Sequence, residues 1–142
     1  MSVKKHDRHE SKVEFENAYF TIHDDAIRLI QNSFGGTKEK RIIFKDYLAV
    51  TSRKILADIL DIGTEIRIAN SIYPQSVEEH SERRIHQERA IGLCFDLLTK
   101  YQLIMHTVGT KDDKYVNETK HLLHEINCLK KWRTSDNKRF KF

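Results

Sequence analysis

The sequence predicts an all-α protein, and three observations support this fold class. Turn-forming residues are scarce, with five glycines and one proline in 142 residues. Apolar residues recur at spacings of three and four along most of the chain, as they do on one face of a helix. Hydrophobic residues make up 39% and charged residues 32%, a composition that suits one globular domain. We therefore expect an antiparallel up-down four-helix bundle with long second and third helices and a basic C-terminal tail.

The first half of the chain predicts a polar lead and two helices. Residues 1–12 are charged and have no apolar period, so we expect a disordered lead, followed by the bundle at residues 13–134. A first helix is predicted within residues 14–34, because the paired glycines Gly35 and Gly36 can supply a left-handed helix end. A second helix is predicted from about Thr37 to Ile72. Its apolar stripe is wider than one face, which indicates contact with two neighbouring helices or with another subunit.

A joint at the only proline, Pro74, connects the second and third helices. Proline lacks an N–H and disfavours the helical conformation in the residue before it, so the second helix should end near Ile72 or Tyr73. Ser76 and Glu79 have the spacing of a capping box, which predicts a new helix start. The chain should fold back on itself here.

Two further helices are expected after the joint. The third should run from Ser76 to Val108 and end before Gly109, and the fourth should start near Asp112 or Asp113. The inward stripe of the third helix is predicted to begin at Ile85, and that of the fourth is predicted to include Leu122, Leu123, Ile126, Leu129 and Trp132.

The positive charge is concentrated at the C-terminus. The 25 lysines and arginines exceed the 21 aspartates and glutamates by four. From Lys130 onward six basic residues face one acidic residue, Asp136, so this stretch carries +5 and the remainder −1. Such a segment, with its tail at residues 135–142, suits a polyanion or an acidic protein surface. A solvated terminal tail is the alternative interpretation.

Catalytic and metal-binding patterns are weak. Cys94 and Cys128 lie in apolar helical patterns and are expected to be reduced core residues with raised pKa values. Glu118 and His121 form one Glu-x-x-His unit, but a carboxylate-bridged di-iron bundle needs two. His124, three residues after His121, could share a surface metal with it, yet exposed histidines are far commoner than metal sites. We expect no enzymatic activity, no cofactor and no metal.

Basic residues are therefore the candidate binding residues, and aromatic side chains near them could stack on unpaired bases. The predicted nucleic-acid-binding residues are Arg53, Lys54, Arg83, Arg84, Lys130, Lys131, Arg133, Lys138, Arg139 and Lys141. Arg67 and Arg89 lie beside the first two groups. Asn70, Tyr73, Pro74 and Gln87 are predicted to form the structural joint, with Arg84 or Gln87 hydrogen-bonded to it. The chain shows no signal sequence and no apolar run long enough for a bilayer, so we expect no membrane contact and a cytoplasmic location.

Several spaced residues carry a family resemblance. They are the segment Ala69-Asn70-Ser71-Ile72-Tyr73-Pro74, then Glu79, Arg83-Arg84, Gln87 and Ala90-Ile91, and finally the segment from Leu129 to Asp136. In these positions the chain resembles the four-helix-bundle accessory proteins of diversity-generating retroelements, over roughly residues 40–136. Related bundles are the intervening-sequence proteins of large ribosomal RNA, whose Asn-Ile-Ala-Glu-Gly segment is absent here.

The resemblance implies a pentameric homo-oligomer that binds a reverse transcriptase and its template RNA or cDNA. Such a protein would support mutagenic reverse transcription without catalysing it. A hypothesis from another class is a structural bundle whose basic surface meets an acidic protein partner.

Overall fold

The protein is helical throughout the part that the structure describes. The computed structural model describes the backbone of residues 5–142 and the side chains of residues 14–142 other than residue 112. These residues form no strand, and their helices are α1 (Lys5–Gln31), η1 (Ser33–Gly35), α2 (Lys38–Ile43), α3 (Lys45–Ser71), α4 (Val77–Val108), η2 (Asp112–Tyr115) and α5 (Val116–Arg139), where η denotes a short 3-10 helix. The predicted all-α class is confirmed.

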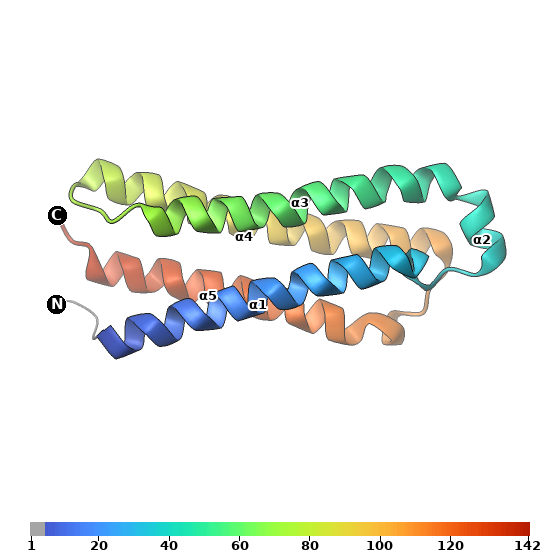
Figure 1. Ribbon diagram of the computed structural model, residues 1–142, viewed down its shortest axis with the longest axis horizontal. Helices are drawn as coiled ribbons and strands as arrows, with labels where there is room; N and C mark the ends of the chain where they lie inside the picture. Colours follow the sequence, from blue (N-terminus) through green and yellow to red (C-terminus); the bar gives the residue numbers. More distant parts are fainter. Residues whose placement is uncertain (1–4) are drawn as a thin grey trace.

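The four long helices, α1, α3, α4 and α5, lie side by side along the long axis, and the chain reverses direction between successive ones (Figure 1). The most extensive packing is between α3 and α4, followed by α1 against α5 and α4 against α5. Each of these helices carries an apolar stripe that must be buried, and the four stripes meet in one core.

Most positions of the apolar stripes are buried, including Ile22, Ile59, Leu97 and Ile126. Two predicted inward positions, Ile85 and Leu123, are exposed. In the turn of α4 that contains Ile85, Arg83 and Gln87 are buried instead. The polar start of this helix therefore contributes polar side chains to the interior, which hydrophobic periodicity does not predict.

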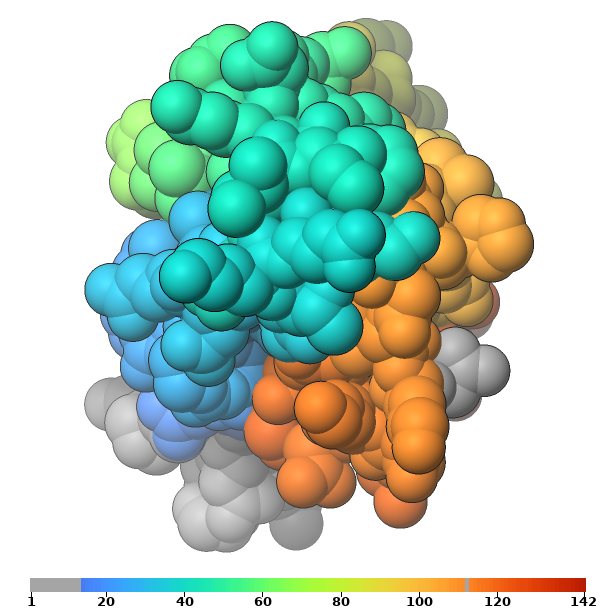
Figure 2. All heavy atoms as spheres, turned by 90° about the vertical axis from the view of Figure 1, so that its right-hand side faces the viewer, coloured from blue at the N-terminus to red at the C-terminus, as the bar shows by residue number. Residues whose placement is uncertain are grey.

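The helix predicted from Thr37 to Ile72 is interrupted at Phe44. The φ and ψ angles of Phe44 are −102° and 25°, outside the helical values, and α2 ends there as α3 begins. Figure 2 shows residues of α2 and the start of α3 spread over this end of the molecule. The half-buried Phe44 packs against the core and its ring contacts Tyr47 edge-on. The break between α2 and α3 thus coincides with a ring that packs on the core.

The first helix is longer at its start than predicted. Residues 5–12 of the expected polar lead have helical backbone and belong to α1, while residues 1–4 lie outside the described part. At the other end α1 stops at Gln31, and the left-handed conformation is adopted by Ser33, Phe34 and Gly35. These positive φ values turn the fully buried ring of Phe34 into the core, so the helix end also serves packing.

The Ser76 half of the predicted capping box at the start of α4 is confirmed, and the Glu79 half differs from the motif. The Ser76 hydroxyl accepts a hydrogen bond from the Glu79 amide at 3.2 Å. The Glu79 carboxylate accepts from the Gln75 amide at 3.1 Å, one residue before the position that the motif predicts. With α3 ending at Ser71 and Pro74 buried, the chain reverses where the sequence placed the joint.

Candidate nucleic-acid interface

A row of lysines lies on the exposed side of α5. Lys130, Lys131 and Lys138 line an open groove together with His124, Asn127, Thr134 and Ser135, all from this one helix. The three lysines are exposed, and none of them forms an ion pair with another described side chain. We refer to Lys130, Lys131 and Lys138 as the lysine face.

Helical periodicity places these lysines outside. Leu122, Ile126, Leu129 and Trp132 form the buried stripe of α5, so residues 130, 131 and 138 fall on the solvent side. The Lys130 ammonium lies 5.3 Å from the centre of the Phe95 ring on α4, a cation–π contact that leaves its charge uncompensated by a carboxylate. Arg133 leans toward α4 as well, with its guanidinium 4.0 Å from the Glu88 carboxylate.

Arg83 does not belong to this surface, which corrects its predicted role in nucleic-acid binding. Its guanidinium donates to both carboxylate oxygens of Asp136, at 2.7 Å and 3.0 Å, and to the Ile72 carbonyl at 2.9 Å. It also lies 5.2 Å from the centre of the Trp132 ring. With only 5% of Arg83 exposed, its charge is neutralised inside the protein and cannot reach a phosphate.

The same network explains the joint. The buried amide of Gln87 donates to Asp136 on α5 at 2.6 Å, so Gln87 has a structural role through α5. Arg84 is exposed and pairs with Glu88 at 3.1 Å. The arginines that hydrogen-bond the joint are Arg83, at the Ile72 carbonyl, and Arg139, at the Tyr73 hydroxyl. The prediction for Arg84 or Gln87 in that place is wrong. Asn70 is exposed at the end of α3.

Most of the predicted basic tail is a docked helix end. Helix α5 continues to Arg139, and the ring of Phe140 is buried against Tyr73 of the joint. Arg139 lies over both of these rings and donates a hydrogen bond of 3.3 Å to the Tyr73 hydroxyl. Lys141 follows the helix and is exposed. Residues 135–140 therefore belong to the folded domain.

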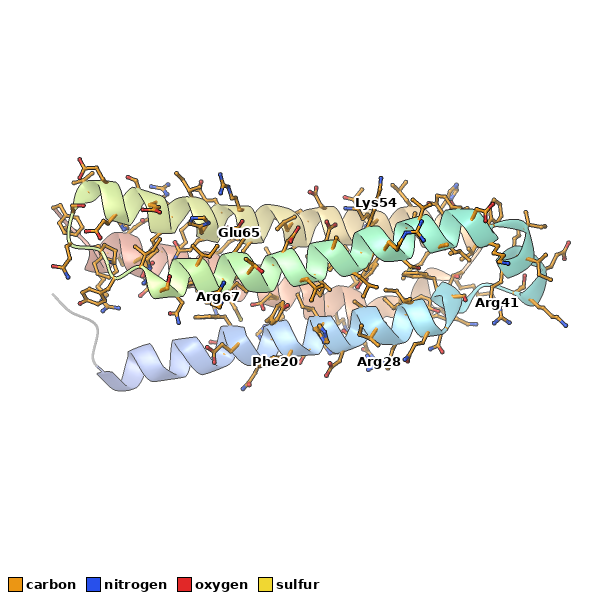
Figure 3. The ribbon with its side chains drawn as sticks, turned by 45° about the horizontal axis from the view of Figure 1, so that its top comes forward. Phe20, Arg28, Arg41, Lys54, Glu65 and Arg67 are labelled. Atoms are coloured by element: carbon orange, nitrogen blue, oxygen red, sulfur yellow. The ribbon has the colours of Figure 1, made fainter. Side chains whose placement is uncertain are left out.

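The basic residues of α3 lie elsewhere. Arg53, Lys54 and Arg67 are exposed on α3, which packs mainly on α4 and α1, whereas α5 packs on α1 and α4. Figure 3 shows Lys54 and Arg67 well apart along the length of α3. Arg89 lines a shallow groove between α3 and α4 that also holds Asp61, Glu65 and Asp96. The structure does not bring the three predicted basic groups together in one patch.

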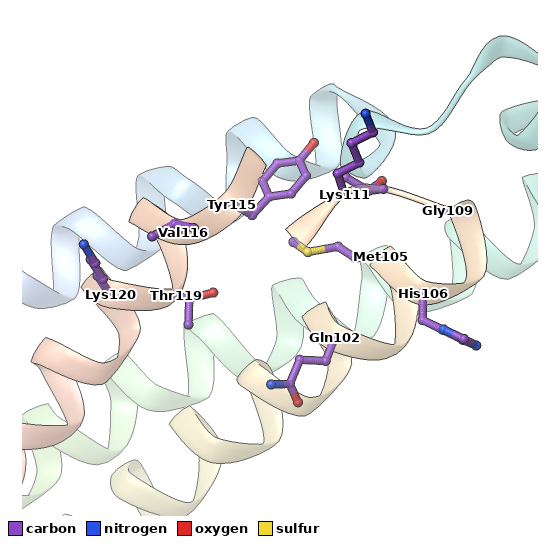
Figure 4. Close-up of a pocket in the computed structure, with 10 residues that line it drawn as sticks. Gln102, Met105, His106, Gly109, Lys111, Tyr115, Val116, Thr119 and Lys120 are labelled. Carbon is purple, nitrogen blue, oxygen red and sulfur yellow. The ribbon is translucent and has the colours of Figure 1, made fainter. Parts of the chain in front are cut away.

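A second hollow lies where α4, η2 and α5 meet (Figure 4). Its lining includes Met105, Tyr115 and Thr119, with Lys111 and Lys120 among its basic side chains. None of the described residues that line it is a carboxylate or a cysteine.

Carboxyl groups from two helices lie in the interior. Asp25 is buried, hydrogen-bonded to Arg28, and 2.7 Å from Nδ1 of His121. His121 is therefore engaged with Asp25, not with His124. Glu125 is fully buried, and burial raises the pKa of its carboxyl to about 9. It is neutral at pH 7.

Both cysteines are free and buried, as predicted. Burial and the nearby Glu125 raise the pKa of Cys94. Burial, followed by the charge of Glu14, raises the pKa of Cys128 to about 12. Glu14 and His124 meet Cys128 between α1 and α5, a cluster that the sequence analysis missed. The local signal was available, since residues 124 and 128 are one helical turn apart, but the third member comes from another helix.

No helix among the described residues is long and apolar enough to cross a membrane. Comparison of the chain with protein-family models, with curated proteins and with solved structures finds no match.

Proposed function

We propose that this protein is a non-enzymatic accessory protein that binds RNA or cDNA through the lysine face of α5. The observation that supports the proposal is that Lys130, Lys131 and Lys138 project from one side of one helix, without a carboxylate partner among the described side chains. For the fold, we propose an antiparallel up-down four-helix bundle of α1, α3, α4 and α5, in which the short helix α2 lies in the connection between α1 and α3.

The lysine face has the dimensions of a backbone-binding surface. Lys131 and Lys138 are seven residues apart, which is about 10 Å along a helix. Exposed ammonium groups at this spacing can neutralise neighbouring phosphates and release their counterions. Thr134 and Ser135 between them can donate hydrogen bonds to phosphate oxygens. Lys141, which follows α5 and is exposed, adds a further positive charge near this end of the helix.

The proposed partners follow from the family resemblance. They are a reverse transcriptase and its template RNA, with the protein as a homo-oligomer, a pentamer by resemblance, in the cytoplasm. Exposed apolar side chains support an interface with a protein, because Ile42 and Ile43 on α2 are 68% and 62% exposed and Leu60 on α3 is 58% exposed. These residues lie on helices other than α5, so a protein partner and RNA could bind together.

Charge reversal tests the lysine face. The variant Lys130→Glu, Lys131→Glu, Lys138→Glu should weaken binding to single-stranded RNA by orders of magnitude. It should also reduce the slope of log K against log salt by about 2, since each phosphate contact contributes about 0.7 on single strands. Fluorescence anisotropy at several salt concentrations measures both quantities.

A matched control uses cations outside the face. The variant Arg53→Glu, Lys54→Glu, Arg67→Glu makes the same change in net charge on α3 and should retain the wild-type salt slope. Equal losses in the two variants would mean that only net charge matters, and the proposed face would be wrong. If RNA and DNA bind weakly in every variant while an acidic protein binds in a salt-dependent way, the protein-binding hypothesis replaces this one.

A further inference from the structure

A glutamate, a histidine and a cysteine meet where α1 packs on α5. The ligand atoms of Glu14, His124 and Cys128 all lie within 4.8 Å of one another. The Cys128 sulfur is 3.5 Å from Nε2 of His124. Only 5% of Cys128 is exposed, whereas Glu14 and His124 are exposed. The cluster therefore has a buried sulfur at its base and is open to solvent on its outer side.

The surrounding fold keeps the three side chains together. His124 and Cys128 are one turn apart on α5 and thus point to the same side of the helix. The residue after Glu14 is Phe15, which is buried and stacks on Trp132 with the ring centres 4.5 Å apart. Trp132 is one turn beyond Cys128. This stacked pair fixes α1 against α5 directly beside the cluster.

The donor set and its spacing suit zinc. Thiolate, imidazole and carboxylate are the three ligand types that Zn²⁺ takes in proteins, and a site with three protein ligands leaves a fourth position for water or another group. With Zn–S about 2.3 Å and Zn–N about 2.05 Å, a tetrahedral site separates sulfur and nitrogen by about 3.6 Å. Cys128 Sγ and His124 Nε2 lie 3.5 Å apart, so they are already close to that separation without any movement of the side chains.

Opposite charges act on the cluster, since the Glu14 carboxylate favours a bound cation and the Lys131 ammonium opposes one. Burial and the charge of Glu14 oppose a thiolate at Cys128 in the metal-free protein, which makes this cysteine a poor nucleophile. A divalent cation reverses both effects, because it compensates the carboxylate and takes the place of the thiol proton. Binding would release that proton, so affinity should fall as the pH is lowered.

We propose that Glu14, His124 and Cys128 form a zinc site that joins α1 to α5. The site is independent of the nucleic-acid proposal, although His124 also lines the groove of the lysine face. A metal at this position would hold the first helix against the helix that carries the lysines and would add positive charge beside them.

Metal titration of the full-length, chelator-treated protein tests the site. One Zn²⁺ per chain should bind by isothermal titration calorimetry, and Co²⁺ should produce a thiolate charge-transfer band with the visible absorption of tetrahedral cobalt. Zn²⁺ should also raise the melting temperature. The variants Cys128→Ser, His124→Asn and Glu14→Gln should each lower the zinc affinity by more than about tenfold. Loss of a residue that only supports a metal ligand already costs about 10- to 100-fold.

The control variant is His106→Asn, which removes an exposed histidine at the end of α4 and should leave zinc affinity unchanged. The proposal is overturned if the wild type binds less than one zinc per chain or lacks the cobalt–thiolate band. Equal affinity in the wild type, His124→Asn and Glu14→Gln would overturn it too. Those two positions are exposed, so their variants remain informative even if Cys128→Ser does not fold.

Discussion

Glu125 is the residue whose environment is least favourable to its charge. Its side chain is 0% exposed, and neither carboxyl oxygen has a hydrogen-bond partner among the described residues. Burial raises its pKa from an ordinary value of 4.5 to about 9. The folded protein therefore holds a neutral carboxyl group that the unfolded chain ionises at neutral pH.

This difference in pKa predicts how stability depends on pH. Between pH 4.5 and about 9 the unfolded chain binds fewer protons at residue 125 than the folded protein does. The stability that Glu125 contributes through proton binding is fully present below pH 4.5 and is lost as the pH rises toward 9. The free energy of unfolding should therefore fall over this window. Glu125→Gln has no titratable group at this position and should not show this decline. With rising pH, the stability of the variant relative to the wild type should therefore increase by up to about 1.4 kcal/mol per pH unit.

Urea unfolding at pH 5 and pH 8 measures the effect. Glu88→Gln, which changes a carboxylate on the surface of α4, is the control and should follow the wild type at both pH values. A constant difference between Glu125→Gln and the wild type from pH 5 to pH 8 would show that Glu125 does not have a raised pKa.

At the scale of helices, Gly63 allows α1 and α3 to approach each other closely. The Tyr19 hydroxyl on α1 donates to the Ile59 carbonyl on α3 at 2.8 Å. A Cβ added at Gly63 would lie 2.4 Å from that hydroxyl oxygen and 2.7 Å from the ring carbon that carries it. Glycine at position 63 thus leaves the space that the Tyr19 ring occupies.

Two glycine-to-alanine substitutions should therefore change the stability of the protein in opposite directions. Ala is favoured over Gly inside a helix by about 1 kcal/mol, so Gly92→Ala on α4, where nothing lies within 4 Å of the new Cβ, should stabilise the protein by about that amount. Gly63→Ala should instead destabilise it by up to about 2 kcal/mol, because overpacking exceeds the gain in propensity. Thermal or urea unfolding measures both.

Removing the tyrosine ring supplies the cross-check. In a Tyr19→Leu background, Gly63→Ala should become neutral or stabilising, since the clashing atoms are gone. If Gly63→Ala is equally destabilising in both backgrounds, contact with Tyr19 is not the cause.

For the whole molecule, the Arg83–Asp136 pair connects the C-terminal helix to the joint at one end of the bundle. The two residues are 53 positions apart, and their side chains are 7% and 4% exposed. Asp136 accepts from Arg83 and Gln87, while Arg83 also holds the Ile72 carbonyl. One carboxylate thus helps to position α4, α5 and the turn that precedes α4.

Asp136→Asn should cost about 3–5 kcal/mol of stability, because it leaves the buried guanidinium of Arg83 without a counter-charge. Hydrogen exchange should show the largest loss of protection in the last turns of α5. The double variant Arg83→Met, Asp136→Leu removes both charges and should recover much of the loss. Glu88→Gln, which removes the exposed partner of Arg84, should change stability by no more than about 1 kcal/mol. A similar small effect for Asp136→Asn would contradict the assigned role.

Local patterns predicted most of the fold. The capping box at Ser76, the joint at Pro74 and the ends near Gly35 and Gly109 depend on residues within a few positions of one another. The same holds for the buried stripe of each helix. The bend at Phe44 was missed because no glycine or proline marks it, and the residue at the bend packs on the core through a long-range contact.

The candidate sites were harder to predict, because charge alone does not say which way a side chain faces. Lys130, Lys131 and Lys138 remain candidates since their own helix turns them outward. Arg83 was misassigned because its partner, Asp136, lies in another helix. The Glu14–His124–Cys128 cluster was missed for the same reason.

By itself, then, the sequence determined that this protein is helical, where the chain turns and which stripe of each helix is apolar, since these properties arise from interactions between near neighbours in the chain. Only the tertiary structure decided which charges are exposed, which are buried in pairs, and which ligand atoms from separate helices come together. Those properties depend on how α1, α4 and α5 pack, and packing joins residues that the sequence places far apart.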